Sequence, residues 1–521
     1  MNSQHKVGKS ASIISACTLF SRILGFIRDM VLASLFGTSW LADAFFVAFR
    51  IPNFLRRLFG EGALSGAFIP IFSDYLTNKS REESEELASA SLTLLLFALV
   101  LTTILGIAFA PIIVKVIAPG FSGQDKLPLT ILLTRYMFPY ILLIGLAALM
   151  MALLNSLKHF AIPAFSPAIL NIAIITSALI ISPRLEQPVI GIAIGVIIGG
   201  IGQLLAQATM VHLKGFRLRF TINPHHPGVK RISKLMLPAI FGLAVDQINV
   251  LVATMLASLE SIAGTGAISA LYYGNRVVQF PLGVFGIAIA TASLPTIAAH
   301  AARQDIDGVR TTLTYALRLT FFICLPASIG IFILAKPIII LLFERGAFGA
   351  YSTAITTSTL IYFSLGIFAY AGVKIITPVY YTFSDTRRPV IIGVVAVVSN
   401  IILNVALMFP LKVAGLALGT SLSSIISFSL LLYFLRTHLQ RVEATAIIKS
   451  FFITLIVSAV MGLVCYATLT LSRRYLSPSI KEYTNVLLPI ITSIASYFFF
   501  AWILHLQELK YFLNIFSKSK E

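Results

Sequence analysis

The sequence predicts an all-α polytopic membrane protein, with fourteen transmembrane helices in two pseudo-symmetric six-helix lobes plus two extra C-terminal helices. Three observations support this prediction. Of the 521 residues, 58% are hydrophobic and only 11% are charged, which leaves too little polar surface for a soluble globular protein. Apolar blocks long enough to span a bilayer, which takes roughly 20 residues, recur along the whole chain. Three short strings recur at a spacing of roughly 225 residues, which indicates an internal repeat.

The apolar blocks lack the alternation of polar and apolar residues that membrane-spanning strands show, so we expect helices. The first block has two arginines in its middle and no early cleavage site, and we expect it to be a retained helix and not a signal peptide. A turn, FPLKVAG, separates the eleventh span from the twelfth. The expected spans are 10–35, 41–73, 87–117, 129–157, 161–183, 188–213, 234–258, 266–299, 313–341, 353–383, 389–410, 412–436, 446–471 and 485–507.

Lysine and arginine fall mainly on one side of these spans, which places that side and both chain termini in the cytoplasm. Basic loops that face anionic lipid account for most of the net charge of +19, so we expect no binding to nucleic acid. The three cysteines, Cys17, Cys324 and Cys465, lie in separate spans and are interpreted as small core residues and not as a metal site.

The repeat divides the chain into parts. The string VIGIAIG matches VAGLALG, while ALSGAFIPIFSDY and NSLKHFAIPAF match IAIATASLPTIAAH and TFSDTRRPVII. Because each half holds an even number of spans, we expect the two lobes to be related by an axis along the membrane normal. The expected parts are an N-terminal lobe (1–213), a basic cytoplasmic linker (214–233), a C-terminal lobe (234–436), and the two extra spans with a cytoplasmic tail (437–521).

The second span, LADAFFVAFRIPNFLRRLFGEG, carries four charged residues at intervals of seven, seven and four positions, which align them on one helical face. These four are Asp43, Arg50, Arg57 and Glu61. Arg56 points about 100° to the side of that face. The other cations singled out within spans are Arg22, Arg28, Arg276 and Lys374.

Two interpretations of the charges are open. Structural ion pairs, or side chains that reach the membrane interface, explain Arg50, Arg57, Glu61 and Arg318 as well as a ligand does. The whole set of cations nevertheless exceeds the acids near it, and each unpaired cation at the bilayer centre costs at least ~2.5–3.5 kcal/mol. Such a surplus is tolerable around water and an anion, and the planar fork of arginine suits a phosphate. We therefore predict a hydrated, cationic central cavity that receives a phosphate-bearing ligand.

A second polar group lies in the C-terminal half. It combines one acid, Asp246, with Asn400, Asn404 and Thr420, and the two asparagines are one helical turn apart. One carboxylate with neutral oxygens suits a hard monovalent cation. A hydrogen-bonded cluster between helices, around a protonated Asp246, explains the same residues, so the spacing leaves both interpretations open.

Several segments together resemble one family. SRILGFIRDMVLASLFG, ADAFFVAFRIPNFLRRLFGEGALSGAFIPIF, YYGNRVVQFPLGVFGIAIATASLP and PLKVAGLALGTSL are similar to the MurJ/MviN family of lipid II flippases, within the multidrug/oligosaccharidyl-lipid/polysaccharide exporter superfamily. The resemblance covers essentially the whole chain. It implies a bacterial inner-membrane protein that moves undecaprenyl-pyrophosphate-linked peptidoglycan precursor to the periplasmic leaflet by alternating access, driven by membrane potential or a cation gradient. It also implies that spans thirteen and fourteen form a groove for the polyprenyl tail.

The resemblance assigns roles to individual residues. It implies that Arg22, Arg28 and Arg276 bind the pyrophosphate. The residues that match the second-helix motif of the family, with roles in gating or sugar contact, are Asp43, Arg56, Arg57 and Glu61. The residues that match the sodium site of some members, and that favour Na⁺ as a coupling ion, are Asp246, Asn400, Asn404 and Thr420. The chain departs from the family at Asn404, where a relative can carry an acid, and at Asn275 and Gln279, where some relatives carry acids.

The partners and the class of activity follow from the same reasoning. We expect lipid II as the ligand, a monomer embedded in membrane lipid, contacts with the cell-wall synthesis machinery, and no cofactor. An enzyme acting on the same lipid would need an acid pair, nucleophile or metal site in a sizeable extramembrane loop, and the sequence has none. The alternative function left open is export of another polyprenyl-linked oligosaccharide.

Overall fold

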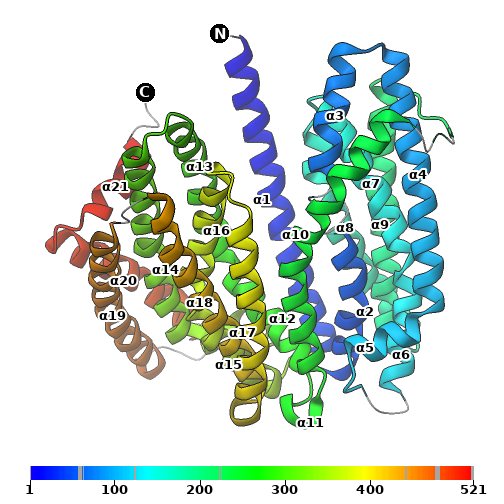
Figure 1. Ribbon diagram of the computed structural model, residues 1–521. Coiled ribbons are helices and arrows are strands. Elements are labelled where there is room, and N and C mark those ends of the chain that lie inside the picture. The colour runs from blue at the N-terminus through cyan, green and yellow to red at the C-terminus, as the bar shows by residue number, and fades with distance from the viewer. Residues whose placement is uncertain are drawn as a thin grey trace. The chain divides into compact units, whose positions relative to one another are not determined.

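The computed structural model describes residues 2–56, 62, 64–121, 125–221, 223, 226–439, 443–475 and 481–517. Within these ranges only the backbone is described for 2–14, 237–246, 444, 481–482 and 513–517. Every regular element in the described part of the chain is helical, and no strand occurs there (Figure 1). The predicted all-α fold class is confirmed.

The chain divides into two compact units, residues 1–259 and residues 260–521. The helices of the first unit are α1 (Asn2–Phe36), α2 (Trp40–Arg56), α3 (Leu64–Asn78), α4 (Arg81–Ala108), α5 (Ala110–Ile117), α6 (Lys126–Met137), α7 (Pro139–Ser156), α8 (Ala161–Ile180), η2 (Ser182–Arg184), α9 (Pro188–Leu213) and α10 (Pro227–Ala257). Those of the second are α11 (Glu260–Ala263), α12 (Ala267–Pro281), η3 (Leu282–Gly286), α13 (Ile287–Ala302), α14 (Ile306–Phe343), α15 (Ala350–Ser364), α16 (Ile367–Thr382), α17 (Arg387–Leu411), α18 (Val413–Leu439), α19 (Ala444–Tyr475), α20 (Lys481–Ile503) and α21 (Gln507–Ser517).

The apolar helices make this a multi-pass membrane protein. In the described part of the chain, ten helical stretches are long and apolar enough to cross a membrane, and the pair α15 and α16, bent by 46°, makes an eleventh. These eleven coincide with eleven of the fourteen predicted spans. The other three predicted spans fall on α1, on α2 with α3, and on α10, each of which is described only in part. The count of fourteen therefore stays a prediction.

Two predicted spans are interrupted at corresponding places of the repeat. Span 129–157 is formed by α6 and α7, which meet at Phe138, and Pro139 begins α7 because a proline lacks the amide hydrogen that a helix interior requires. Span 353–383 is formed by α15 and α16, which meet at Leu365 and Gly366. A similar break at Phe109, before Pro111, separates α4 from α5 inside predicted span 87–117.

The repeated glycine strings are explained by helix packing. In the first unit α9 packs closely on α8, and a Cβ atom on Gly195 would lie 2.7 Å from Cβ of Ser177. In the second unit α18 packs on α17 in the same way, and a Cβ atom on Gly415 would lie 2.1 Å from the carbonyl oxygen of Leu407. Small residues at such positions let the two helical backbones approach each other inside a membrane.

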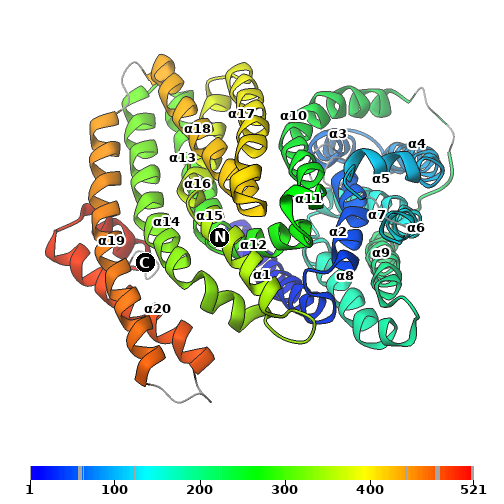
Figure 2. The same cartoon turned by 90° about the horizontal axis from the view of Figure 1, so that it is seen from below.

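Each unit has its own apolar core. In the first unit α3, α4, α7 and the linker before α10 share a cluster that includes Phe68, Phe72 and Phe216. In the second unit α14, α16 and α18 share a cluster that includes Phe321 and Tyr380. The two C-terminal helices α19 and α20 pack against each other and against α14 (Figure 2). The predicted extra helices therefore belong to the second unit.

Candidate functional site

Arg28 lies where α1 meets α8, and two side chains hold it. Its Nε and Nη2 atoms donate to Oδ1 of Asp29 at 3.0 and 2.7 Å, and Nη1 donates to Oδ1 of Asn171 at 3.0 Å. Asn171 also donates from Nδ2 to the carbonyl oxygen of Ser21 at 3.1 Å. The Arg28 side chain is 12% exposed and Asp29 is fully buried. The guanidinium is thus neutralised by its neighbour in the sequence and oriented by a residue of another helix.

Asn171 is the residue of this cluster that the sequence prediction missed. A single asparagine within an apolar span is costly unless its amide is hydrogen-bonded, so SPAILNIAII carried a usable signal. Arg22, six positions before Arg28 on α1, is exposed. The two arginines that were predicted to share a ligand therefore lie in different surroundings in the described structure.

Asp43 forms a buried ion pair within the first unit. Its Oδ2 atom lies 3.6 Å from Nζ of Lys126, and the two side chains are 1% and 8% exposed. The same Nζ atom lies 4.0 Å from the ring centre of Phe121. This pair connects α2 with the start of α6. Removal of only one partner of such a buried pair strongly destabilises the folded protein. The contact gives Asp43 a structural role in joining α2 to α6, and its predicted role toward a ligand stays a prediction.

The remaining charges of the second span are only partly described. Arg50 is half-buried, and Arg56 donates from Nε to Oδ1 of Asn53 at 3.0 Å. Arg57 and Glu61 lie outside the described residues. The predicted alignment of four charges on one face is therefore described only for Asp43 and Arg50.

In the second unit, α12 carries a cation next to an apolar surface. Arg276 is half-buried and precedes Phe280 by one helical turn, so the two side chains share a helical face. After α12 the chain forms the π-helical turn η3, which touches α16, since a Cβ atom on Gly286 would lie 3.0 Å from Cβ of Ala371. Lys374 follows on α16 one turn later and is exposed.

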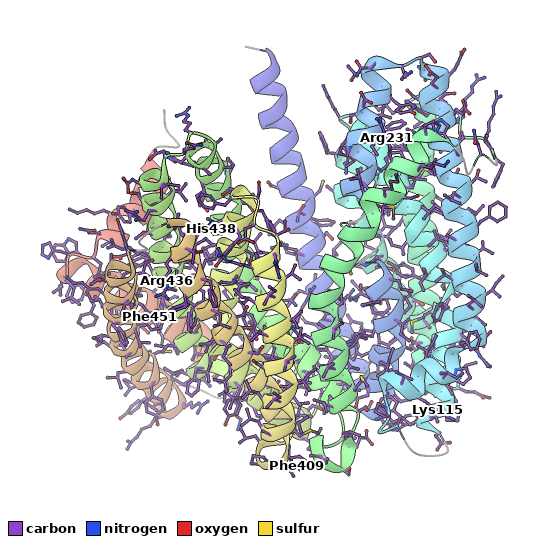
Figure 3. The ribbon with its side chains drawn as sticks, viewed as in Figure 1. Lys115, Arg231, Phe409, Arg436, His438 and Phe451 are labelled. Carbon is purple, nitrogen blue, oxygen red and sulfur yellow. The ribbon has the colours of Figure 1, made fainter. Side chains whose placement is uncertain are left out.

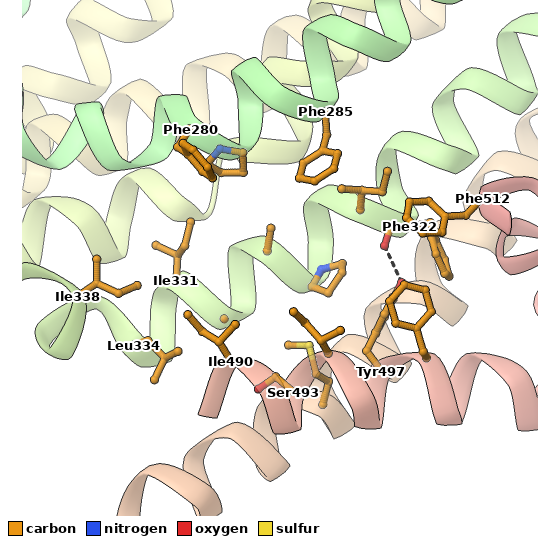
Figure 4. Close-up of a pocket in the computed structure, with 18 residues that line it drawn as sticks. Phe280, Phe285, Phe322, Ile331, Leu334, Ile338, Ile490, Ser493, Tyr497 and Phe512 are labelled. Carbon is orange, nitrogen blue, oxygen red and sulfur yellow. Dashed lines mark hydrogen bonds between the residues drawn. The ribbon is translucent and has the colours of Figure 1, made fainter. Parts of the chain in front are cut away.

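An apolar pocket of about 380 Å³ begins at this face of α12 (Figure 4). Phe280 and Phe285 form one wall, and α14, α19, α20 and α21 form the others. The only polar side chains among its lining residues are Ser493 and Tyr497, and the Tyr497 hydroxyl donates to the carbonyl oxygen of Phe322 at 2.7 Å. The pocket can hold a hydrocarbon chain, and the predicted extra helices supply part of its wall.

The neutral polar cluster of the second unit forms a chain of hydrogen bonds. Asn404 donates from Nδ2 to Oδ1 of Asn400 at 3.0 Å, and Asn400 donates from Nδ2 to Oγ1 of Thr420 at 3.3 Å. Asn404 is fully buried, and its Oδ1 atom has no hydrogen-bond partner among the described residues. A Cβ atom on Gly419 would lie 2.3 Å from this oxygen. The Asp246 side chain lies outside the described residues, so the structure brings together three of the four predicted ligands.

A charged cluster outside the apolar spans ties the turn after α16 to the end of α18. Oδ2 of Asp385 lies 2.8 Å from Nε2 of His438 and 3.3 Å from Nη1 of Arg388. Burial raises the pKa of the Asp385 carboxyl, but hydrogen bonds with His438 and with the Arg388 amide outweigh burial, so the pKa lies below its ordinary value. His438 and Phe409, near the end of α17, lie at opposite ends of the second unit (Figure 3).

Two helical units, with charged side chains buried in spans and an apolar pocket, define a multi-pass membrane protein. A solved structure described as an inward-facing conformation of a multidrug resistance MATE family transporter of the MOP superfamily superposes with a TM-score of 0.70. It covers 84% of this chain and 99% of its own, at 15% identity, so this similarity concerns the fold alone.

The family profile described as Lipid II flippase MurJ matches residues 32–486, and the chain belongs to this family. A probable lipid II flippase MurJ of Vibrio cholerae serotype O1 is 39% identical over 442 residues, 83% of each chain. The lipid II flippase MurJ of Burkholderia cenocepacia is 35% identical over 425 residues, 81% of this chain and 82% of its own.

A solved structure described as lipid II flippase MurJ in an inward closed conformation has a TM-score of 0.80 and 30% identity, and covers 94% of this chain and 99% of its own. The family consists of transporters, so the prediction that the chain is not an enzyme is confirmed.

Proposed function

We propose that this protein is a lipid II flippase, which moves undecaprenyl-pyrophosphate-linked peptidoglycan precursor from the cytoplasmic to the periplasmic leaflet of a bacterial inner membrane by alternating access. Both termini would lie in the cytoplasm. Family membership supports the transported lipid, and the geometry of the second unit supports the way in which it is bound.

The observation that carries the proposal is the position of Arg276 on α12. This residue lies one turn from Phe280, which lines the apolar pocket. A ligand that joins a pyrophosphate to a long hydrocarbon chain needs a cation and an apolar surface within a short distance, and one helical turn is about 5.4 Å long. In this proposal the pyrophosphate binds at Arg276 and the polyprenyl tail occupies the pocket.

Arg28 is proposed as a second pyrophosphate ligand. Asp29 and Asn171 fix the orientation of its guanidinium, so little conformational entropy is lost when a phosphate binds. Arg22 is proposed as a third ligand. The other charged residues proposed to line the cavity or to gate it are Asp43, Arg50, Arg56, Arg57, Glu61 and Lys374.

A cation gradient or the membrane potential would reset the empty carrier. The unpartnered, buried Oδ1 atom of Asn404 supports a cation site with Asn400 and Thr420, because amide and hydroxyl oxygens are suitable ligands for Na⁺. Asp246 is proposed as the acid of this site. A charge that crosses 100 mV exchanges about 2.3 kcal/mol, which is enough to bias a two-state carrier.

The arginines are tested by leaflet transfer of lipid II in spheroplasts depleted of their own flippase. Arg28→Ala and Arg276→Ala are expected to lower transfer ten- to a hundredfold, since a hydrogen bond to a charged group contributes about 1.5–3 kcal/mol. Arg231→Ala, an exposed arginine on α10, is the matched control and is expected to transfer normally. Normal transfer by both site variants would refute the site, and absence of transfer by the wild type would favour another polyprenyl-linked oligosaccharide.

The pocket is tested by filling it. A Cβ atom on Gly330, which lines the pocket, would have no neighbour within 4 Å, so the side chain of Gly330→Leu begins in open space at the wall of the cavity. Gly66→Leu on α3 makes the same change at another open helical position. Transfer is expected to fall at least tenfold in the first variant only, with both proteins equally stable in detergent. Equal transfer by the two variants would exclude the pocket as the site of the tail.

A further inference from the structure

The linker between α9 and α10, residues 214–226, runs from the start of α4 along the side of this helix and back, and this excursion is called the dip. Near its start, the carbonyl oxygen of Gly215 accepts a hydrogen bond from Arg81, the first residue of α4. Further on, the amide of Thr221 donates to Oγ1 of Thr93 at 3.0 Å. Twelve helical positions separate these two contacts, so the linker descends about 18 Å along the helix. Arg231, just after the linker, and Lys115 lie at opposite ends of the first unit (Figure 3), so the dip starts from the Arg231 end.

The linker then turns back. Asn223 donates to Oε1 of Glu86 at 3.4 Å, which is seven positions nearer the start of α4 than Thr93. At the bottom of the dip, two backbone amides are paired with side-chain hydroxyls of α4, since the amide of Arg219 donates to Oγ of Ser89 at 3.1 Å. An unpaired amide is costly close to hydrocarbon, and these two hydroxyls remove that cost.

The tip of the dip exposes a large apolar side chain. Phe220, beside Thr221, is 76% exposed. The exposed apolar band of α4 begins at the position after Thr93, with Leu94, Phe97 and Leu101 each 41% exposed or more. Phe220 therefore lies at the edge of the surface that faces hydrocarbon, where an aromatic ring can enter the bilayer.

Two positively charged residues precede Phe220 in the chain. Arg217 and Arg219 are exposed, and neither guanidinium has a hydrogen bond or ion pair with any residue that the structure describes. The nearby acids of α4 are engaged elsewhere, Glu85 with Arg81 at 3.3 Å and Glu86 with the returning linker. The tip therefore combines an exposed apolar ring with two exposed cations beside the start of the apolar band of α4.

We propose that the linker tip, residues 217–221, is a membrane anchor that binds an anionic phospholipid. Phe220 inserts between acyl chains, and the two arginines contact the headgroup phosphate and its surplus charge, as basic residues near an anionic leaflet do. An acidic protein partner fits less well because it would leave the 76% exposed Phe220 ring without an apolar surface to bury it. The anchor lies directly before α10, so it holds that end of the helix at the membrane surface.

The test uses the full chain with Phe220→Trp in a background where both natural tryptophans are replaced (Trp40→Phe and Trp502→Phe). The protein is reconstituted in nanodiscs that contain equal mole fractions of brominated phosphatidylglycerol or brominated phosphatidylcholine. Quenching of the single tryptophan reports which lipid lies beside the tip. We expect strong quenching in both discs and a preference for phosphatidylglycerol of about fivefold for each arginine, the equivalent of ~1 kcal/mol per basic residue.

Arg217→Gln with Arg219→Gln is expected to remove the preference and to keep the quenching by either lipid. The matched control removes two exposed arginines at the end of α19, Arg473→Gln with Arg474→Gln, and is expected to retain the preference. Weak quenching in both discs would overturn the membrane anchor and favour a protein partner. Equal loss of preference in the two double variants would overturn the local site, because it would show an effect of overall charge.

Discussion

The two polar clusters inside the helical units differ in charge and in completeness. In the first unit Arg28, Asp29 and Asn171 join a cation, an acid and an amide, and the guanidinium donates to both partners. In the second unit Asn400 and Asn404 form a neutral chain with Thr420, and one buried oxygen lacks a partner among the described residues. The first cluster is therefore prepared to hold a fixed charge, and the second can accept one.

The helices that carry these clusters occupy equivalent places in the two units. Asn171 lies on α8, which packs on the glycine-containing face of α9, and Asn400 lies on α17, which packs on that of α18. Shifted by the repeat spacing of roughly 225 residues, Asn171 falls one helical turn before Asn400. The same helix of the repeat thus supplies the amide in both units, and the surrounding residues decide whether the cluster is charged or neutral.

The largest effect is expected from breaking the charged cluster. Asp29→Ala leaves the guanidinium of Arg28 in a largely buried place without its acid, and loss of one partner of a buried pair costs about 3–5 kcal/mol. Thermal unfolding in detergent should show a large drop in the melting temperature. A variant as stable as the wild type would mean that water reaches the arginine in the folded protein.

A smaller effect is expected when the amide of α8 is removed. Asn171→Leu removes the oxygen that accepts a hydrogen bond from Arg28 and the amide that donates one to the Ser21 carbonyl. Each buried polar group left unsatisfied costs about 1–3 kcal/mol of folding free energy. We also expect lipid II transfer to fall, because the guanidinium loses its orientation. Asn171→Gln, which keeps both functions on a longer side chain, should recover part of the transfer, whereas a purely steric role for residue 171 predicts no recovery.

A change next to the neutral cluster of Asn400, Asn404 and Thr420 should lower the stability of the protein by as much as Asn171→Leu does, or by less. Gly419→Ala places a methyl group at 2.3 Å from Oδ1 of Asn404, and overpacking of this kind costs about 1–3 kcal/mol. If the oxygen binds Na⁺, the wild type should melt at a higher temperature in NaCl than in choline chloride, and the variant should lose this difference. Equal melting of the wild type in both salts would argue against the cation site.

Truncation within the neutral cluster should have the smallest effect among the buried sites. Asn404→Ala removes one hydrogen bond between side chains, and such bonds in membrane proteins contribute about 0.6 kcal/mol on average. The melting temperature in choline chloride should therefore change little, in contrast to the Asp29→Ala variant. A loss as large as that of Asp29→Ala would show that the neutral cluster is as essential to folding as the charged one.

The pair of Asp385 and Arg388, which lies outside the apolar spans, provides a reference for both buried clusters. Because the pKa of the Asp385 carboxyl is lowered on folding, its contribution is present above the ordinary pKa and is lost as the pH falls through the lowered value. Asp385→Asn should melt slightly below the wild type at neutral pH and equally with it in strong acid. Added salt should reduce the difference at neutral pH but should not affect the Arg28 cluster.

Sequence reasoning found the features that depend on neighbours along the chain. Helical spans follow from runs of apolar residues, and the equivalence of α9 and α18 follows from the similar strings VIGIAIG and VAGLALG. Arg28 stood out as a charge in an apolar span. Its partner Asn171 lies on another helix, as Lys126 does relative to Asp43, so no local periodicity relates them. The apolar pocket likewise draws its walls from six elements of the second unit, which only the folded chain brings together.

The π-helical turn η3 makes the packing of α13 sensitive to the deletion of a single residue. Its defining hydrogen bond runs from the Ile287 amide to the carbonyl of Leu282, five residues back, where an α-helix would reach four. The turn therefore contains one residue more than an α-helical turn would. As a result, every residue of α13 is rotated about the helix axis by about 100° relative to its position in an unbroken α-helix. Loss of a single codon in this turn would restore an ordinary helix and present a different face of α13 to α14 and α16. The pairing of these helices thus depends on a single residue of chain length.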